Sequence, residues 1–274
     1  MNDPELVAFL QWAIPRLGMR WRGYRKVRAR VRKKLHERFR ELGLSDIVAY
    51  RDRLEAHPQE WADLDALCRI TISRFHRDRG VFDHLRRVVL PGLAERASER
   101  DAEAVRCWSA GCASGEEPYT LRILWEQGLS AGRARVPLWI VATDVDERLL
   151  ERAREGRYPA SSLKELPREL LEPAFVRDGE QFRVRDELRA GVEFRRQDIR
   201  EAMPAGPFDL VLCRNLAFTY FDEEGQREVL RGIDERLVAG GYLVVGAHES
   251  LPEGVPDLVS CPTQPGLWQK RADA

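Results

Sequence analysis

The stretch Val105-Arg-Cys-Trp-Ser-Ala-Gly-Cys-Ala-Ser-Gly-Glu-Glu-Pro-Tyr119 decides the fold of this chain. Its first residues form an apolar run that is typical of a buried strand, and a glycine turn then leads into the start of a helix. Such a turn lets a ligand approach bare backbone, and the helix that follows presents its free N–H groups to that ligand. The stretch therefore predicts a site for a nucleotide-like ligand.

The helix start carries two adjacent carboxylates, Glu116 and Glu117. A dinucleotide-binding loop would have to hold a pyrophosphate at this place. Two carboxylates would repel phosphate and attract a cation, so a nucleoside that carries positive charge instead of phosphate fits better. S-adenosylmethionine, which has a sulfonium and an ammonium group, is the cofactor that we expect.

The composition sets broad limits on the class of protein. A chain of 274 residues with 43% hydrophobic content can bury one large core or two modest ones. Its 45 basic and 45 acidic residues cancel, so a preference for a charged partner must come from local segregation. Segregation is present, because residues 20–40 contain eleven Lys or Arg and one acidic residue.

Cysteine usage and the lack of long apolar segments predict a cytoplasmic protein. The five cysteines are odd in number and widely spaced, which is typical of reduced thiols. Cys107 and Cys112 have no second pair and no nearby histidine, so we expect no metal site. No signal peptide and no run of 18 apolar residues is encoded, and we expect no membrane insertion.

Two domains are predicted, a helical one over residues 1–100 and a ligand-binding one over 101–274. The first includes a strongly basic amphipathic helix over 23–42, with an apolar stripe and a cover of Arg and Lys. Residues 70–78, Ile-Thr-Ile-Ser-Arg-Phe-His-Arg-Asp, follow neither helical pattern and are expected to form a connecting loop. A polar joint at 98–103 is the expected boundary.

From Ala104 onward, short apolar runs alternate with helical segments, which favours a parallel α/β sheet. The expected strands are 105–109, 136–142, 208–213 and 242–247, and the expected helices are 116–127, 147–155 and 223–237. About residues 178–196, the segments 181–185 and 192–195 alternate with period two. We expect them to form a small inserted antiparallel β-subdomain.

Ligands of open α/β sheets bind beyond the carboxyl ends of the strands. This rule selects the turn at Gly111, then Asp144, then the pair Asp198-Ile199, then the pair Arg214-Asn215. Asp144 is expected to accept hydrogen bonds from the ribose hydroxyls, the alternative being a helix cap. Asp198 suits the adenine amino group, with Ile199 against the ring, the alternative being a surface carboxylate.

Three motifs resemble those of the CheR family of protein-glutamate methyltransferases of bacterial chemotaxis. They are Trp108 to Tyr119, Ala142-Thr-Asp-Val-Asp146, and Cys213-Arg-Asn215 followed by Tyr220-Phe-Asp222. The loop 70–78 and the basic helix resemble further parts of the family, so the resemblance covers nearly the whole chain. It implies a class I S-adenosylmethionine-dependent methyltransferase fold, Rossmann-like, with an all-α N-terminal domain.

The resemblance also implies a set of ligand contacts in this chain. These are Thr71, Ser73, Arg77, Glu117, Asp144, Asp198, Ile199, Arg214 and Asn215.

The chemistry follows from the acceptor itself. A glutamate carboxylate is already ionised at neutral pH and attacks a sulfonium methyl in one displacement, without a general base. The enzyme must supply positioning. Arg77 is expected to hold the acceptor carboxylate, because a guanidinium binds carboxylates bidentately, and the alternative is a surface pair with Asp78. Tyr220 is the second candidate catalytic residue.

The chain departs from the family pattern on the acceptor side. Leu216–Thr219 is one residue longer than usual, so either Thr219 or Tyr220 takes the place of the family tyrosine. Thr71 stands where the family often has Asn, and His76 where it usually has a second Phe. His76 is either a proton acceptor for a different substrate or an aromatic packing substitute.

The basic helix 23–42 is expected to dock an acidic partner protein of the chemoreceptor kind. The alternative is a merely solvated face. We rank nucleic acid well below a partner protein, because few aromatic residues interleave with the charges. The preferred function is a protein-glutamate O-methyltransferase. One rival is a related methyltransferase with another protein or a small molecule as acceptor, and the other is a non-catalytic sensor that only binds the cofactor.

Overall fold

The computed structural model describes residues 1–128, 136–254 and 257–272. It divides into two compact units. The N-terminal unit comprises residues 1–71 together with 219–226, and the sheet unit comprises 72–218 together with 227–274.

The N-terminal unit is helical. Its helices are α1 (Asp3–Ala13), the 3-10 turn η1 (Ile14–Leu17), α2 (Trp21–Tyr24), α3 (Arg28–Leu42), α4 (Ile47–Ala56) and α5 (Glu60–Cys68). Side chains spaced three or four residues apart on these helices form one core, which includes Leu6, Leu10, Val31, Leu35, Tyr50 and Leu64. The capping box at Asn2 and Glu5 starts α1, and Gly43, in the left-handed region at φ +67°, ends α3.

The basic helix differs from the prediction at its start. It was expected from Gly23, but α2 ends at Tyr24 and α3 begins at Arg28. Val27 between them has φ −110° and ψ 1°, outside the helical region. The interruption is therefore a feature of the backbone that the continuous apolar stripe of the sequence does not reveal.

A short segment from late in the chain belongs to this same unit. Met19 and Phe221 form an isolated antiparallel bridge, and the N–H of Arg20 donates to the carbonyl of Tyr220 at 2.8 Å. Gly23 permits this contact, because a Cβ there would lie 2.4 Å from the carbonyl oxygen of Thr219. The segment 219–226 holds the end of α12 (Ala217–Tyr220) and the start of α13 (Glu223–Asp234).

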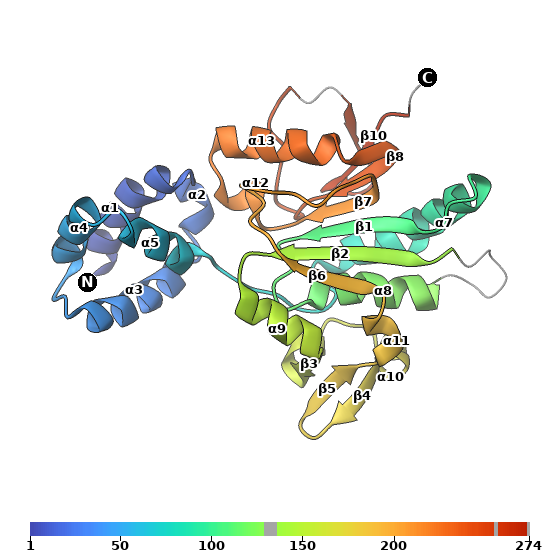
Figure 1. Ribbon diagram of the computed structural model, residues 1–274, viewed down its shortest axis with the longest axis horizontal. Helices are drawn as coiled ribbons and strands as arrows, with labels where there is room; N and C mark the ends of the chain where they lie inside the picture. Colours follow the sequence, from blue (N-terminus) through green and yellow to red (C-terminus); the bar gives the residue numbers. More distant parts are fainter. Residues whose placement is uncertain (129–135, 255–256, 273–274) are drawn as a thin grey trace. The chain divides into compact units, whose positions relative to one another are not determined.

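The sheet unit contains a seven-stranded, mostly parallel sheet in the order β6-β2-β1-β7-β8-β10-β9. Figure 1 shows its central strands side by side in this order. The strands are β1 (Val105–Ala110), β2 (Leu138–Asp144), β6 (Val192–Arg196), β7 (Phe208–Cys213), β8 (Leu237–Val244), β9 (Leu258–Ser260) and β10 (Leu267–Lys270). The first five are parallel, whereas β10 is antiparallel to both neighbours. The predicted α/β fold is confirmed.

The helices of this unit follow the alternation expected from the sequence. They are α6 (Arg79–His84), the π-helix η2 (Leu85–Val89), α7 (Leu90–Glu99), α8 (Glu116–Gly128), α9 (Glu147–Glu155), η3 (Ala160–Leu163), α10 (Arg168–Ala174) and α11 (Asp186–Arg189), together with most of α13. The loop expected over residues 70–78 contains neither helix nor strand.

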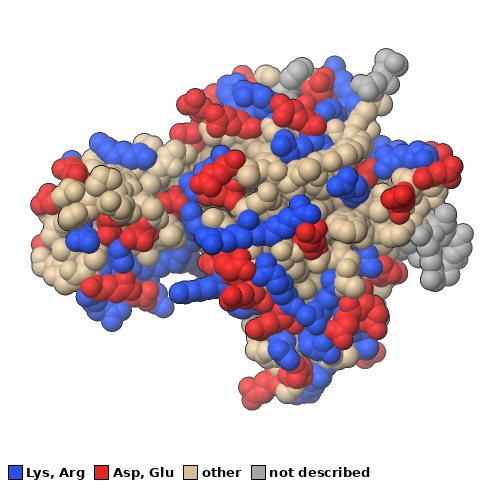
Figure 2. Space-filling view, viewed as in Figure 1, with Lys and Arg blue, Asp and Glu red and all other residues tan. Residues whose placement is uncertain are grey.

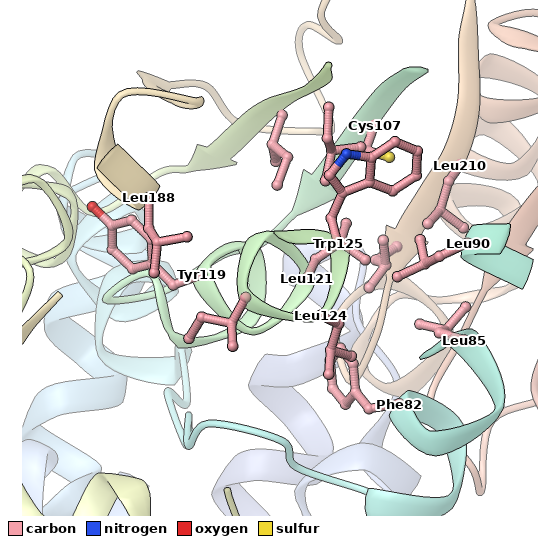
Figure 3. Packing of buried hydrophobic residues seen from close by; sticks show 14 of the residues in the cluster. Phe82, Leu85, Leu90, Cys107, Tyr119, Leu121, Leu124, Trp125, Leu188 and Leu210 are labelled. Atoms are coloured by element: carbon pink, nitrogen blue, oxygen red, sulfur yellow. The ribbon is translucent and has the colours of Figure 1, made fainter. Parts of the chain in front are cut away.

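The core of the sheet unit includes the helices that precede β1. Figure 3 shows one packed cluster whose members include Leu85, Leu90, Leu121, Leu124, Trp125 and Leu210. The segment 72–100 thus shares its core with the sheet, because α6, η2 and α7 bury their apolar side chains among those of α8 and the strands. The two compact units divide at Thr71 and Ile72, whereas the sequence had suggested a joint near residue 100.

The small antiparallel sheet exists, but its pairing differs from the prediction. It consists of β3 (Arg157–Pro159), β5 (Gln181–Val184) and β4 (Phe175–Asp178), in that order. The segment 192–196, expected to pair with 181–185, instead pairs with β2 in parallel as an edge strand of the main sheet. Period-two alternation cannot distinguish these two partners, because it marks a half-buried strand of either kind.

Two arginines of this antiparallel sheet form ion pairs, one within the sheet and one with α11. Arg157 pairs with Asp178 at 2.7 Å, and Arg183 pairs with Asp186 at 2.7 Å. Figure 2 shows Lys and Arg beside Asp and Glu over much of the visible face.

Among the described residues, no helix has the length and apolarity needed to cross a lipid bilayer.

Candidate active site

The glycine turn at the carboxyl end of β1 has a left-handed backbone and close neighbours, which leave no room for a side chain at Gly111 or Gly115. Gly111 and Gly115 have φ values of +72° and +89°, and Ala113 between them has +51°. A Cβ at Gly111 would lie 2.8 Å from Leu216, and one at Gly115 would lie 2.9 Å from the Cβ of Ala153. The turn therefore needs glycine both for its conformation and for its close contacts.

Hydrogen bonds join this turn to the end of β2. The N–H groups of Gly111 and Cys112 donate to the carbonyl of Thr143 at 2.8 and 2.9 Å. The N–H of Ala113 donates to Oδ2 of Asp144 at 2.8 Å. Two strand ends are thus fixed to each other at the place where the sequence predicts the ligand.

Asp144 does not cap a helix. Its Oδ1 accepts the N–H of Asp146 at 3.0 Å, while Asp146 itself caps α9 by accepting from the N–H of Arg148. Burial raises the pKa of Asp144, and the hydrogen bonds from backbone N–H groups oppose that rise. The cap alternative for Asp144 is wrong, and its carboxylate lies at the carboxyl end of β2.

The two glutamates at the start of α8 lie in different surroundings. Glu117 accepts from the hydroxyl of Ser109 at 2.8 Å through Oε1 and from Arg214 at 2.9 Å through Oε2. Glu116 is 3% exposed and accepts from the hydroxyl of Ser114. The expectation that both carboxylates face a cationic ligand is wrong for Glu116, because its side chain is buried beneath the turn.

Arg214 connects three segments of the sheet unit. Its side chain is 2% exposed, and besides Glu117 it contacts Oδ2 of Asp78 at 2.7 Å and the carbonyl of Arg77 at 2.8 Å. Its guanidinium also lies over the ring of Phe82, 4.9 Å from the centroid. Arg214 thereby fixes the segment around residue 77 to α8 and to the end of β7.

Arg77 is held at the same strand end. One of its terminal nitrogens donates to the carbonyl of Ile72 at 2.5 Å, and the other donates to Oδ1 of Asn215 at 3.0 Å. Asp78, proposed as a surface partner of Arg77 in the alternative interpretation, pairs with Arg214 instead. Asn215 has a left-handed backbone, with φ +55°.

Asp198 and Ile199 follow β6 at the neighbouring strand end. Oδ1 of Asp198 accepts the N–H of Arg200 at 3.0 Å, and Oδ2 contacts the Arg200 guanidinium at 2.7 Å. Ile199 is buried. Asp198 is thus largely enclosed and paired, rather than a freely exposed surface carboxylate.

A comparison with known protein families assigns the chain that carries this site. Residues 71–265 match the model of the "CheR methyltransferase, SAM binding domain". The chain belongs to the CheR methyltransferase family.

Relatives of known name support this assignment. The chain is 35% identical over 230 residues to a chemotaxis protein methyltransferase of Salmonella typhimurium, covering 80% of this chain and 75% of that protein. It is also 31% identical over 239 residues to an uncharacterized 104.1 kDa protein of Rhodobacter capsulatus. That match covers 87% of this chain but only 25% of the Rhodobacter protein.

A solved structure, the N-methyltransferase NodS of Bradyrhizobium japonicum with S-adenosylhomocysteine, is 18% identical with a TM-score of 0.31. The match covers 60% of this chain and 61% of NodS, and at this TM-score it adds nothing to the family assignment. The family match confirms the predicted resemblance, and at the level of the family it confirms an S-adenosylmethionine-dependent methyltransferase and its cofactor.

The remaining predicted site residues are less informative. Ser73 is half-buried in the sheet unit, and Thr71 is an exposed residue of the N-terminal unit. Tyr220 also belongs to the N-terminal unit, where its ring lies 5.2 Å from that of Tyr24. Their roles in this CheR-family protein stay predictions.

His76 lies in the core. It is 0% exposed, its ring is stacked on that of Phe82 at 5.5 Å, and burial lowers its pKa while Asp83 opposes that change. Its backbone N–H donates to the hydroxyl of Thr120 at 3.1 Å. These contacts favour the interpretation of His76 as an aromatic packing substitute over that of a proton acceptor.

Two polar residues of the site, Ser109 and Glu249, escaped the sequence analysis, and Asp78 has a partner other than the Arg77 of the alternative interpretation. Ser109 binds Glu117, Asp78 binds Arg214, and Glu249 accepts the N–H of Asn215 at 2.8 Å. Ser109 and Glu249 lie at or just after the carboxyl ends of β1 and β8. The rule that selected Asp144 would therefore have found both, had it been applied to every strand.

Proposed function

We propose that this chain transfers the methyl group of S-adenosylmethionine to glutamate side chains of a chemoreceptor-like signalling protein. The observation that carries the proposal is Arg77, a guanidinium fixed by Asn215 and Ile72 at the strand ends of a CheR-family domain. A fixed guanidinium suits an acceptor that is itself a carboxylate.

The residues at the strand ends fit the cofactor. Asp144 would accept from the ribose hydroxyls, since each of its oxygens receives one backbone hydrogen bond in the structure and retains a second lone pair. Glu117 and Asn215 would hold the amino-acid part, and Asp198 with Ile199 the adenine. The bare backbone at Gly111 leaves room for close approach of the ligand. When bound, the cofactor supplies an electrophilic methyl group on a sulfonium.

Arg77 has donors left for an acceptor. A guanidinium carries five N–H groups, and the two bonds to Ile72 and Asn215 engage two of them. The remaining donors would hold a glutamate carboxylate beside the reacting methyl. Because that carboxylate is ionised at neutral pH, the reaction needs orientation rather than proton removal. The buried position of His76 agrees with a site that uses no imidazole base.

An acidic partner would dock on the basic residues of α2, α3 and the turn between them. Several of these residues already have partners within the chain, such as Arg38 with Glu60 and Lys34 with the carbonyl of Arg69. The side chains of five others are exposed and make neither an ion pair nor a hydrogen bond within the part of the chain that the structure describes. They are Arg22, Arg25, Lys26, Lys33 and Arg40. These five would form the complementary surface.

One assay distinguishes the proposed glutamate methylation from methylation of another acceptor and from cofactor binding without transfer. Purified protein is incubated with methyl-labelled S-adenosylmethionine and the cytoplasmic fragments of several bacterial chemoreceptors. Base-labile label, released as methanol, supports a glutamate ester, and base-stable label would show another acceptor chemistry. Tight binding of S-adenosylhomocysteine without transfer to any acceptor would favour a sensor.

The variant Lys33→Glu/Arg40→Glu should weaken receptor binding several-fold at low salt, while Arg51→Glu, on α4, serves as the control.

A further inference from the structure

We infer that Glu249 is a positioning residue, which holds Asn215 in its left-handed conformation and through Asn215 orients Arg77. Glu249 follows β8 and is half-buried. Its Oε2 accepts the N–H of Asn215 at 2.8 Å and the N–H of Gly246 at 2.5 Å. One carboxylate oxygen thus joins the carboxyl ends of β7 and β8.

The loop that carries Glu249 is folded around its own carboxylate. The N–H of Glu249 donates to the carbonyl of Gly246 at 2.9 Å, while the N–H of Gly246 donates back to the side chain. A Cβ at Gly246 would lie 2.7 Å from Oε2 of Glu249 and 3.3 Å from Cγ of Asn215. Glycine at 246 is therefore what allows the carboxylate to reach both N–H groups.

The strain at Asn215 gives this contact its effect. Asparagine adopts a left-handed backbone more readily than other non-glycine residues, but φ +55° is still less favoured than helical or extended backbone, so a hydrogen bond that fixes it there matters. The same residue uses Oδ1 to accept from Arg77 at 3.0 Å. If the backbone of Asn215 relaxes, Oδ1 moves and Arg77 loses one of its two anchors. Glu249 thus acts at a distance from the ligand, through backbone geometry.

The test measures the affinity for S-adenosylhomocysteine by calorimetry, which requires no acceptor. This inference rests on the proposed contact of Asn215 with the cofactor. Glu249→Ala should weaken binding about tenfold, and Asn215→Ala should do at least the same. In the double variant Asn215→Ala/Glu249→Ala the two losses should not add, because no amide remains to be positioned. Affinity of Glu249→Ala within twofold of wild type, or additive losses, would overturn the inference.

Two further variants separate positioning from folding. Gly246→Ala should reproduce the effect of Glu249→Ala, since the new methyl displaces the carboxylate, whereas Gly92→Ala, which meets nothing within 4 Å, should not. Glu249→Gln keeps an acceptor oxygen and should bind more tightly than Glu249→Ala; the reverse order would contradict the inference. Asp209→Asn is the control for loss of a carboxylate that accepts a backbone N–H. Absence of methyl transfer with this binding pattern intact would refute only the proposed reaction.

Discussion

The two ends of β7 both hold charged groups with little exposure, yet they are built differently. At the amino end, Asp209 accepts the N–H of Arg106 at 2.8 Å and pairs with Arg100, beside an irregularity in the pairing of β7 with β8. At the carboxyl end, Arg214 pairs with carboxylates from two other segments, next to the left-handed Asn215. Asp209 thus joins β7 to Arg100 and Arg106, which lie just before and within β1. The carboxyl end instead fixes several segments in one arrangement, beside a residue with a left-handed backbone.

The largest expected effect is on stability, from the variant Arg214→Met. It removes the buried cation and leaves Glu117 and Asp78 without their partner. Both carboxylates retain some exposure, so we expect the lower part of the usual range for a broken buried pair, a loss of about 3 kcal/mol. Asp209→Asn should lose about 1 kcal/mol. Urea unfolding of the two variants measures the difference. Equal losses would show that the two ends of β7 are energetically alike.

The next effect is on turnover, from Arg77→Ala. Loss of the acceptor contact should lower the rate of glutamate methylation on the order of 100-fold, equivalent to about 2.7 kcal/mol of transition-state stabilisation. Urea unfolding should change by less than about 1 kcal/mol, because the side chain is only half-buried. Arg79→Ala, an exposed arginine two residues away, is the matched control. An Arg77→Ala variant with more than a third of the wild-type rate would remove Arg77 from the reaction.

A smaller effect is expected at the glycine turn. Gly115→Ala places a methyl 2.9 Å from Ala153 in a left-handed backbone, whereas Gly43→Ala has a similar backbone but meets nothing within 4 Å. Both variants should lose about 1 kcal/mol from the conformation alone, and Gly115→Ala should lose a further 1–2 kcal/mol, approximately, from the clash. Thermal unfolding compares the two. Identical losses would mean that the turn accommodates a side chain.

The sequence predicted the parts of this molecule that depend on local pattern. The strand-turn-helix around Gly111 to Glu117 was found because alternating apolar runs and glycines leave a direct mark. Asp144 and Asn215 were expected at strand ends, and the structure has them there. The pairing of residues 192–196 with β2 was missed, since the partner of a strand is set by tertiary contacts.

Tertiary contacts also decide which polar side chains of the site are paired with each other, and the sequence pattern does not show these pairs. Glu116 and Glu117 look equivalent in the sequence, and only packing shows that Glu116 is buried against Ser114. The alternative interpretation paired Asp78 with Arg77, its neighbour in the chain. The partner of Asp78, Arg214, lies 136 residues away, a distance over which single-sequence patterns carry no information.

The smallest expected effect is on the pH dependence of the affinity for S-adenosylhomocysteine. It should depend on Asp144, at the carboxyl end of β2, and not on Asp209, at the amino end of β7. Burial raises the pKa of Asp144 above its ordinary value of 3.8. The ionised carboxylate would accept hydrogen bonds from the ribose hydroxyls. The affinity for S-adenosylhomocysteine should therefore fall as the pH is lowered through this raised pKa. The fall should begin at a higher pH than it would for an ordinary aspartate. The loss should stay below about tenfold, the size of one ordinary hydrogen bond of about 1 kcal/mol, because the protonated carboxyl group can still bond the ribose. Calorimetry from about pH 8 down to pH 5 records the profile. Asp144→Asn should bind more weakly at neutral pH and flatten the profile, whereas Asp209→Asn should leave it unchanged. If Asp144→Asn keeps the wild-type profile, the pH dependence arises elsewhere and the ribose contact is wrong.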